Sequence, residues 1–133
     1  MSADLLTTAF RFASQGIVCV PVRGDGSKAP ALATWAQYQA TPPTPQEIVG
    51  WFSKPQAGLG VVTGTAANLL MIEFEGRAVA AGLHKRAMNA VIAAGLGDIW
   101  QLMVDGYCSV TPSGGIHFLV KVGGDPIGGN IKL

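Results

Sequence analysis

Two acidic residues, Glu73 and Glu75, lie one residue apart in the apolar segment 71–76 (MIEFEG). Alternate side chains of a strand share a face, so in a strand these two carboxylates would point the same way. Two carboxylates that converge disfavour each other's ionised form unless a cation or a shared proton lies between them. Because hard oxygen ligands suit Mg²⁺ or Mn²⁺, the spacing predicts a metal site. The same spacing also fits an amphipathic strand with a solvated charged face.

A glycine turn followed by a histidine forms the second candidate, in Ser113-Gly114-Gly115-Ile116-His117. Backbone N–H groups at such a turn can hold a phosphate, with Ser113 and His117 as further donors. Ser-Gly-Gly is also an ordinary turn sequence, and a histidine in a strand is often structural. The sequence has no P-loop pattern and no GxGxxG pattern before a helix, so it does not support the common mononucleotide and dinucleotide folds.

Lys28 is the third candidate for phosphate binding. It lies in the loop segment 26–30 (GSKAP), shortly after a β-rich run. The nearby glycines and Pro30 fix the loop backbone, which helps a lysine to reach a phosphate as a point charge. A loop lysine can equally be a solvated surface residue, so position alone leaves both interpretations open.

The composition limits the class of protein. The chain has 133 residues, enough for one domain with a core, and 9 Lys+Arg against 8 Asp+Glu give a net charge of +1. Overall charge therefore provides no steering toward nucleic acid. Only 13% of residues are charged and the mean hydropathy is +0.36. These values exclude disorder and fit a buried sheet, a high Ala and Gly content, or a surface that a partner covers.

The sequence shows no targeting segment and no cysteine motif. It has no apolar run near the roughly 18 residues that a membrane helix needs, and no basic start followed by an uninterrupted apolar stretch. We therefore expect a cytoplasmic protein with no membrane partner. Cys19 and Cys108 lie in apolar runs without metal-ligand spacing, so we expect both to be small buried side chains.

Local patterns predict the elements that position these residues. Helices are predicted over residues 3–15, 45–52 and 77–94, and Thr44 with Glu47 forms a capping box for the second. Strands are predicted over residues 17–22, 58–64, 69–75, 107–111 and 116–122. The short connections predict two hairpins, 58–64 with 69–75 and 107–111 with 116–122.

This order of elements predicts an α+β protein with mixed or antiparallel strand pairing. The helix over 77–94 is expected to cover one sheet. The acid strand and the histidine strand are expected to be neighbours in the sheet, because the proposed site cannot assemble otherwise.

Taken together, these segments resemble the N-terminal primase/polymerase (prim-pol) domain of the archaeo-eukaryotic primase superfamily, found in phage and plasmid replication proteins. That family shows, in order, a Gly-x-Lys-x-Pro-like loop, a Trp-containing helix, a Gly-x-Gly-hydrophobic-x-Thr-Gly strand, a strand with two acids, and a Thr-x-Ser-Gly-Gly-x-His hairpin. The matching segments are residues 26–30, 45–52, 58–64, 70–76 and 111–117. The resemblance implies an α+β fold with a small αβ unit over 1–57 and an incomplete RRM-like antiparallel sheet with a covering helix over 58–133.

The resemblance also implies an activity, namely a DNA primase/polymerase that transfers nucleotides to a primer or an initiating nucleotide by two-metal chemistry. Glu73 and Glu75 would be catalytic ligands of Mg²⁺ or Mn²⁺. His117 would be catalytic and would contact the triphosphate together with the turn residues 113–115. Lys28 would neutralise phosphate charge. The implied partners are nucleoside triphosphates, a DNA template or primer, and a helicase domain or protein.

Two departures from the family pattern change this expectation. The family usually has aspartates where this chain has Glu73 and Glu75, whose extra methylene moves the carboxylates outward. The family also has a third acid on a later strand, after a Gly-Asn-x-Lys-Leu stretch that corresponds to residues 129–133 at the end of this sequence. We therefore expect this fragment to be inactive alone, because two-metal catalysis needs enough ligands to fix both ions.

Two other classes of function remain open. The missing third acid favours a noncatalytic module that binds nucleotide or nucleic acid. The apolar composition favours an interaction domain that docks on a partner chain. A metal-dependent phosphoesterase fits less well, because it normally collects more ligands than His84 and His117 offer.

Overall fold

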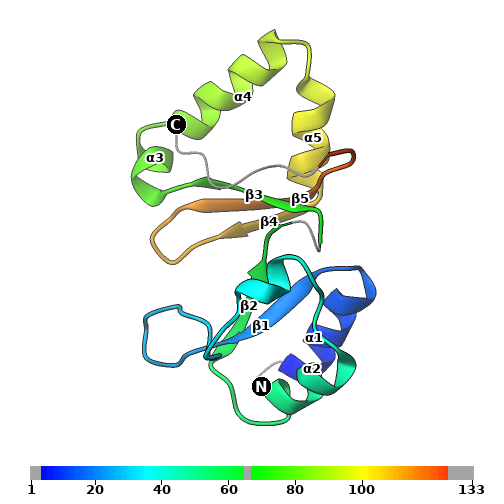
Figure 1. Ribbon diagram of the computed structural model, residues 1–133. Helices are drawn as coiled ribbons and strands as arrows, with labels where there is room; N and C mark the ends of the chain where they lie inside the picture. The colour runs from blue at the N-terminus through cyan, green and yellow to red at the C-terminus, as the bar shows by residue number, and fades with distance from the viewer. Residues whose placement is uncertain (1–3, 65–66, 126–133) are drawn as a thin grey trace. The chain divides into compact units, whose positions relative to one another are not determined.

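The structure, a computed structural model, describes residues 4–64 and 67–125 (Figure 1). Contacts divide the chain into two compact units: unit 1, Met1–Leu69 with Gly123–Leu133, and unit 2, Leu70–Val122. Each unit combines helices with a small sheet, so the predicted α+β class is confirmed. The division into domains 1–57 and 58–133 stays a prediction. No helix among the described residues is long and apolar enough to cross a membrane.

Unit 1 packs helices against a two-stranded antiparallel sheet. Its elements are α1 (Leu5–Ser14), β1 (Val18–Val22), the 3₁₀ helix η1 (Ala36–Gln39), α2 (Pro45–Phe52) and β2 (Gly58–Val62). β1 and β2 pair along their whole lengths. A buried cluster of Ala9, Ile48 and Phe52 joins α1 to α2. The helices predicted near the N-terminus and after Thr44 are therefore confirmed.

Helix α2 begins where the sequence predicts, because a capping box holds its first turn. The Glu47 backbone N–H donates to the Thr44 hydroxyl at 3.2 Å, and the Thr44 backbone N–H donates to the Glu47 carboxylate at 2.7 Å. The Tyr38 hydroxyl donates to the other Glu47 oxygen at 2.7 Å. The Thr44 N–H, and after it the Tyr38 hydroxyl, lowers the pKa of Glu47. Burial, and after it the Glu47 carboxylate, raises the pKa of Tyr38.

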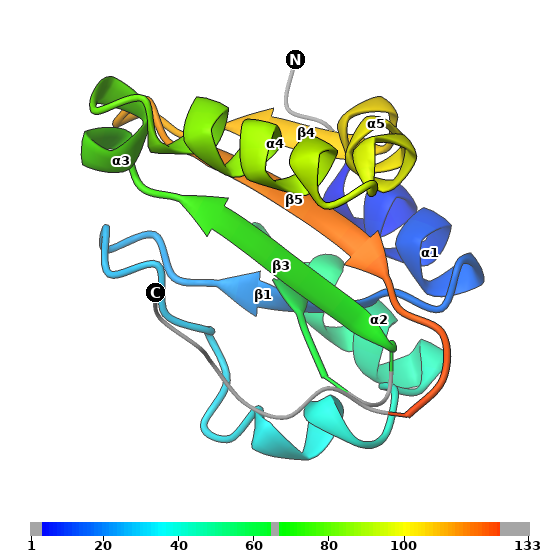
Figure 2. The same cartoon turned by 90° about the horizontal axis from the view of Figure 1, so that it is seen from above.

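Unit 2 is a three-stranded sheet with helices over one face (Figure 2). Its elements are β3 (Leu69–Phe74), α3 (Gly76–Ala80), α4 (Leu83–Ala93), α5 (Gly97–Asp105), β4 (Tyr107–Val110) and β5 (Ile116–Lys121). The strand order is β3-β5-β4. β4 and β5 form the predicted antiparallel hairpin, and the arrows of β3 and β5 run in opposite directions in Figure 2. The acid strand and the histidine strand are thus neighbours, as predicted.

The hairpin predicted between 58–64 and 69–75 is wrong. β2 pairs with β1, whereas β3 joins the other sheet, and among the described residues a single bridge, Gly64 to Leu69, links the two segments. Gly64 has a φ of +135° and Asn68 a φ of +51°, so the backbone leaves the extended conformation between the strands. β2 instead pairs with the buried strand β1 along its whole length.

The helices of unit 2 also differ from the single helix predicted over 77–94. The chain leaves the helical conformation between α3 and α4 at Gly82, whose φ of +73° is left-handed. No sequence pattern predicts α5, because its N-cap residue, Leu96, has no side-chain cap. The covering layer is therefore formed by two helices, α4 and α5, instead of one (Figure 2).

Aromatic rings fill the space between this sheet and its helices. The Trp100 ring of α5 lies 6.0 Å from the Phe118 ring of β5, and Phe74 of β3 lies 6.5 Å from Phe118. Phe118 is buried. Because side chains alternate along a strand, the neighbouring residues Glu73 and His117 belong to the opposite face of the sheet.

The two cysteines have different environments. Cys19 on β1 is buried, as predicted. The predicted burial of Cys108 is wrong, because Cys108 is exposed on β4, which lies at the edge of its sheet.

Candidate functional site

Glu73 and His117 meet on the sheet face opposite the helices. The His117 Nε2 atom lies 3.1 Å from a Glu73 carboxylate oxygen, across the neighbouring strands β3 and β5. The Glu73 side chain is 45% exposed and the His117 side chain is 30% exposed, so a ligand can reach both. Ser109 lies directly opposite His117 on β4, and such cross-strand partners share a face. The predicted acid and histidine are therefore brought together.

Glu75 lies just beyond β3, where its extended backbone continues the strand alternation before α3 begins. Its carboxylate accepts a hydrogen bond from the Arg77 Nε–H at 2.8 Å. Glu75 is 51% exposed and Arg77 is 88% exposed. Each predicted metal ligand thus has its own cationic or protonatable partner.

The turn between β4 and β5 is closed by its own hydrogen bonds. The Thr111 hydroxyl accepts from the Gly115 N–H at 2.9 Å and lies 3.2 Å from the Ser113 hydroxyl. The Gly114 N–H donates to the Thr111 carbonyl at 2.9 Å. A phosphate bound by the N–H groups of these two glycines would have to displace these bonds, whereas the exposed Ser113 side chain is accessible.

Two glycines let this turn pack against the end of β3. A Cβ on Gly76 would collide with the Ser113 carbonyl oxygen, and a Cβ on Gly115 would lie 2.8 Å from the Phe74 carbonyl oxygen. Glycine is the residue that permits backbones to approach this closely. The Ser-Gly-Gly turn therefore lies beside the junction of β3 and α3, near Glu75.

Lys28 belongs to unit 1, in the loop after β1. Hydrogen bonds within the loop fix its backbone: the Ser27 N–H donates to Asp25 at 2.9 Å, and the Ala29 N–H donates to the Ser27 hydroxyl at 3.2 Å. Lys28 is exposed and has a φ of +59°, which is uncommon for a residue other than glycine. Its role in the site stays a prediction.

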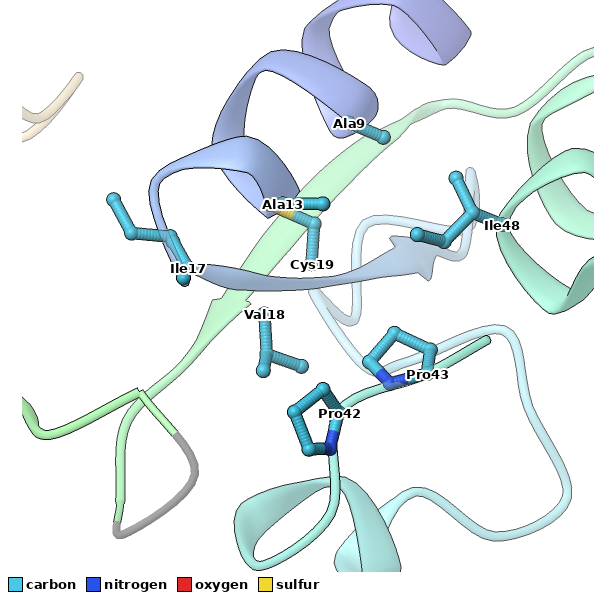
Figure 3. Close-up of a pocket in the computed structure, with 9 residues that line it drawn as sticks. Ala9, Ala13, Ile17, Val18, Cys19, Pro42, Pro43 and Ile48 are labelled. Atoms are coloured by element: carbon cyan, nitrogen blue, oxygen red, sulfur yellow. The ribbon is translucent and has the colours of Figure 1, made fainter. Parts of the chain in front are cut away.

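A separate cavity of about 150 Å³ lies in unit 1, between α1, β1 and the segment before α2 (Figure 3). Its lining includes Ala9, Ala13, Cys19, Pro42 and Ile48. Burial raises the pKa of the Cys19 thiol to about 12. Apolar side chains and a neutral thiol offer no charge to a phosphate, so this cavity is not the nucleotide site.

A family model described as the N-terminal domain of bifunctional DNA primase/polymerase matches residues 9–131. This chain belongs to that family. Membership confirms the resemblance that the sequence motifs predict. It implies a nucleotidyltransferase domain of the DNA primase/polymerase type, which binds nucleotides and DNA. Neither a curated protein nor a solved structure matches the chain.

The donor set of this primase/polymerase domain fits a loosely held divalent cation. Glu73 and Glu75 offer carboxylate oxygens, the ligand type that Mg²⁺ and Mn²⁺ prefer. Within residues 4–64 and 67–125, no three His, Cys, Asp or Glu side chains are grouped so as to hold a metal ion. The residues therefore fit an ion that takes its other ligands from water or from a nucleotide, and do not fit a closed structural site.

Sequence reasoning missed two residues that adjoin the site of this primase/polymerase domain. Arg77 follows the acid strand, and the spacing Glu-x-Arg was the available signal for its ion pair with Glu75. Ser109 lies opposite His117, a placement that follows from the register of the predicted hairpin.

Proposed function

We propose that this domain transfers nucleotides from nucleoside triphosphates to a primer 3′-OH or an initiating nucleotide on a DNA template, in phage or plasmid replication. The proposal is supported chiefly by the 3.1 Å contact of Glu73 and His117, in a chain that matches the primase/polymerase family over residues 9–131. A carboxylate and an imidazole on neighbouring strands supply a metal ligand next to a hydrogen-bond donor for a phosphate.

The candidate site residues of unit 2 have separate roles in the proposed reaction. Glu73 and Glu75 hold Mg²⁺ or Mn²⁺ through carboxylate oxygens. A metal ion held by these carboxylates would supply Lewis-acid chemistry, which would activate the attacking hydroxyl and stabilise the leaving pyrophosphate. His117 and the Ser113 hydroxyl donate hydrogen bonds to the triphosphate, and the glycines 114–115 shape the turn that presents Ser113.

Lys28 and the partners complete the proposal. Lys28 neutralises phosphate charge as a point charge. DNA binding rests on local basic side chains, because the net charge of the chain is +1. We place the reaction in the cytoplasm, with a helicase domain or protein that supplies the template. We expect little turnover from the 133-residue chain alone, because two carboxylates hold two ions poorly.

A labelled-nucleotide extension assay tests the proposal, on primed and unprimed templates with Mg²⁺ or Mn²⁺. It compares the 133-residue chain with a longer chain that continues past residue 133, each with and without Glu73→Gln. We expect metal-dependent incorporation by the longer chain and loss of incorporation in its Glu73→Gln variant. Asp98→Asn on α5 removes a carboxylate outside the site and is the matched control. Undiminished synthesis by the longer Glu73→Gln variant would contradict the mechanism, and robust synthesis by the 133-residue chain would contradict the ligand argument.

A noncatalytic module that binds nucleotide or nucleic acid is the second candidate. It is favoured by the absence of a three-ligand group among the described residues. This alternative predicts nucleotide binding that persists in Glu73→Gln, and no incorporation by any length of chain. The extension assay combined with a nucleotide-binding measurement therefore separates the two functions.

A further inference from the structure

Arg77 is an exposed arginine that is held at one atom. Its Nε–H donates to Glu75 at 2.8 Å, and its side chain is 88% exposed. A guanidinium carries five N–H donors in a planar fork. Among the described residues, no hydrogen bond comes from the terminal NH₂ groups of Arg77. Those groups are therefore accessible to a ligand.

The fold places Arg77 at the edge of the candidate site. The residue before it, Gly76, packs so closely on the Ser113 carbonyl that a side chain there would collide with it. Arg77 therefore lies one residue from the contact between the β3–α3 junction and the Ser-Gly-Gly turn. Its carboxylate partner, Glu75, is one of the two predicted metal ligands.

We propose that Arg77 binds a phosphate group of the incoming nucleoside triphosphate, and that it does so by exchanging its partner Glu75 for phosphate oxygens. This inference rests on the proposed function. When the Glu75 carboxylate turns to a divalent cation, its attraction for the guanidinium falls, because the carboxylate charge is then neutralised by the cation. The released guanidinium is a planar fork that matches the oxygens of a phosphate.

The exchange is favourable because the two interactions differ in strength. Exposed ion pairs contribute little to stability, so the pair of Arg77 and Glu75 is easily broken. A phosphate can accept from two N–H groups of the guanidinium at once, whereas Glu75 accepts from the Nε–H alone.

Two binding measurements on the 133-residue chain test this role of Arg77. One is fluorescence anisotropy of a labelled, nonhydrolysable nucleoside triphosphate with Mn²⁺, and the other is calorimetry of Mn²⁺ alone. We expect Arg77→Gln to weaken triphosphate binding about tenfold, and Arg77→Lys to weaken it less, because lysine keeps the charge and loses the fork. Arg11→Gln on α1 makes the same charge change elsewhere and should bind triphosphate like wild type.

The Mn²⁺ measurement separates phosphate binding from a structural role. Arg77→Gln should bind Mn²⁺ as tightly as wild type or more tightly, because Glu75 is then released from its ion pair. Unchanged triphosphate affinity in Arg77→Gln would overturn the inference and leave the proposed function standing. Weaker Mn²⁺ binding would also overturn it, because Arg77 would then only orient Glu75. Failure of the wild-type chain to bind triphosphate with Mn²⁺ would overturn both proposals.

Discussion

The His117 Nε2 atom lies 3.1 Å from a Glu73 carboxylate oxygen on the neighbouring strand, and both side chains are partly exposed. The contact uses the Nε2 atom, which donates to the Glu73 carboxylate, so a neutral His117 can donate to a phosphate only through Nε2–H, once Glu73 turns to a cation. It also joins a group that could hold a cation to a group that could hold a phosphate. Substitutions at the two positions should therefore have different kinetic effects.

We predict that Glu73→Gln mainly lowers kcat and that His117→Asn mainly raises the KM for nucleotide in an active, longer chain. Loss of a metal ligand removes charge stabilisation in the transition state, on the order of 100-fold in kcat. Loss of one hydrogen-bond donor to the triphosphate weakens nucleotide binding about tenfold. Lys28→Gln should act like His117→Asn. Steady-state extension kinetics with varied nucleotide measure both parameters, and an effect of His117→Asn confined to kcat would contradict its assignment to phosphate binding.

At the scale of elements, local sequence patterns predict the structure correctly. Thr44, Pro45 and Glu47 mark the start of α2 because the capping box needs only neighbouring backbone groups. The pairing of β4 with β5 follows from a short turn. The contact of Glu73 with His117 joins residues 44 apart in the chain, and no local pattern predicts it: the two strands are expected to be neighbours only because the proposed site requires it.

We predict that Thr44→Ala lowers the free energy of unfolding by about 1 kcal/mol, because it leaves a first-turn N–H without its acceptor. The matched control is Thr41→Ala, an exposed threonine that precedes the helix. Chemical denaturation monitored by circular dichroism gives the comparison. Equal stability of the two variants would contradict the role of the capping box.

The elements that could not be predicted depend on contacts between distant segments. β2 pairs with β1, although β3 is nearer in the sequence. The pairing follows the buried partner strand and not the length of the connection. Gly82 ends a helical pattern through a left-handed φ of +73°, which composition does not reveal. The ion pair of Arg77 with Glu75 depends on side-chain placement beyond a strand end.

We predict that Gly76→Ala destabilises unit 2 by about 1–3 kcal/mol, because the new methyl group meets the Ser113 backbone and forces it to move. Gly123→Ala is the control, since a Cβ at Gly123 meets nothing within 4 Å. The free energy of unfolding should fall in Gly76→Ala and change little in Gly123→Ala. A fully stable Gly76→Ala variant would show that the turn and the β3–α3 junction are not in close contact.

At the scale of the whole molecule, the residues of the candidate site and the groups with shifted pKa values are distributed differently over the two units. Glu73, Glu75 and His117 all lie in unit 2, whereas Lys28 comes from unit 1. Five groups with shifted pKa values lie in unit 1: Asp4, Cys19, Asp25, Tyr38 and Glu47.

Three carboxylates of unit 1 have lowered pKa values because they accept hydrogen bonds. The Thr7 hydroxyl lowers the pKa of Asp4, Ser27 lowers the pKa of Asp25, and the Thr44 N–H lowers the pKa of Glu47. A folded-state pKa below the unfolded value stabilises the fold above the unfolded pKa. That stabilisation is lost as the pH falls through the folded-state pKa, so these groups weaken the fold in acid.

Two groups of unit 1, Cys19 and Tyr38, control how stability changes at alkaline pH. Burial raises the pKa of Cys19 from 9.0 to about 12 and also raises the pKa of Tyr38. A raised folded-state pKa stabilises the fold fully below the unfolded pKa, and this stabilisation is lost as the pH rises through the folded-state pKa. We therefore predict a stability plateau from about pH 5 to pH 9, with a decline on either side. Melting temperatures from pH 3 to pH 11 should show a smaller alkaline decline in Cys19→Ala than in wild type, while Cys108→Ala, which removes an exposed thiol, keeps the wild-type decline. Identical alkaline declines in Cys19→Ala and wild type would show that the buried thiol does not control this limb.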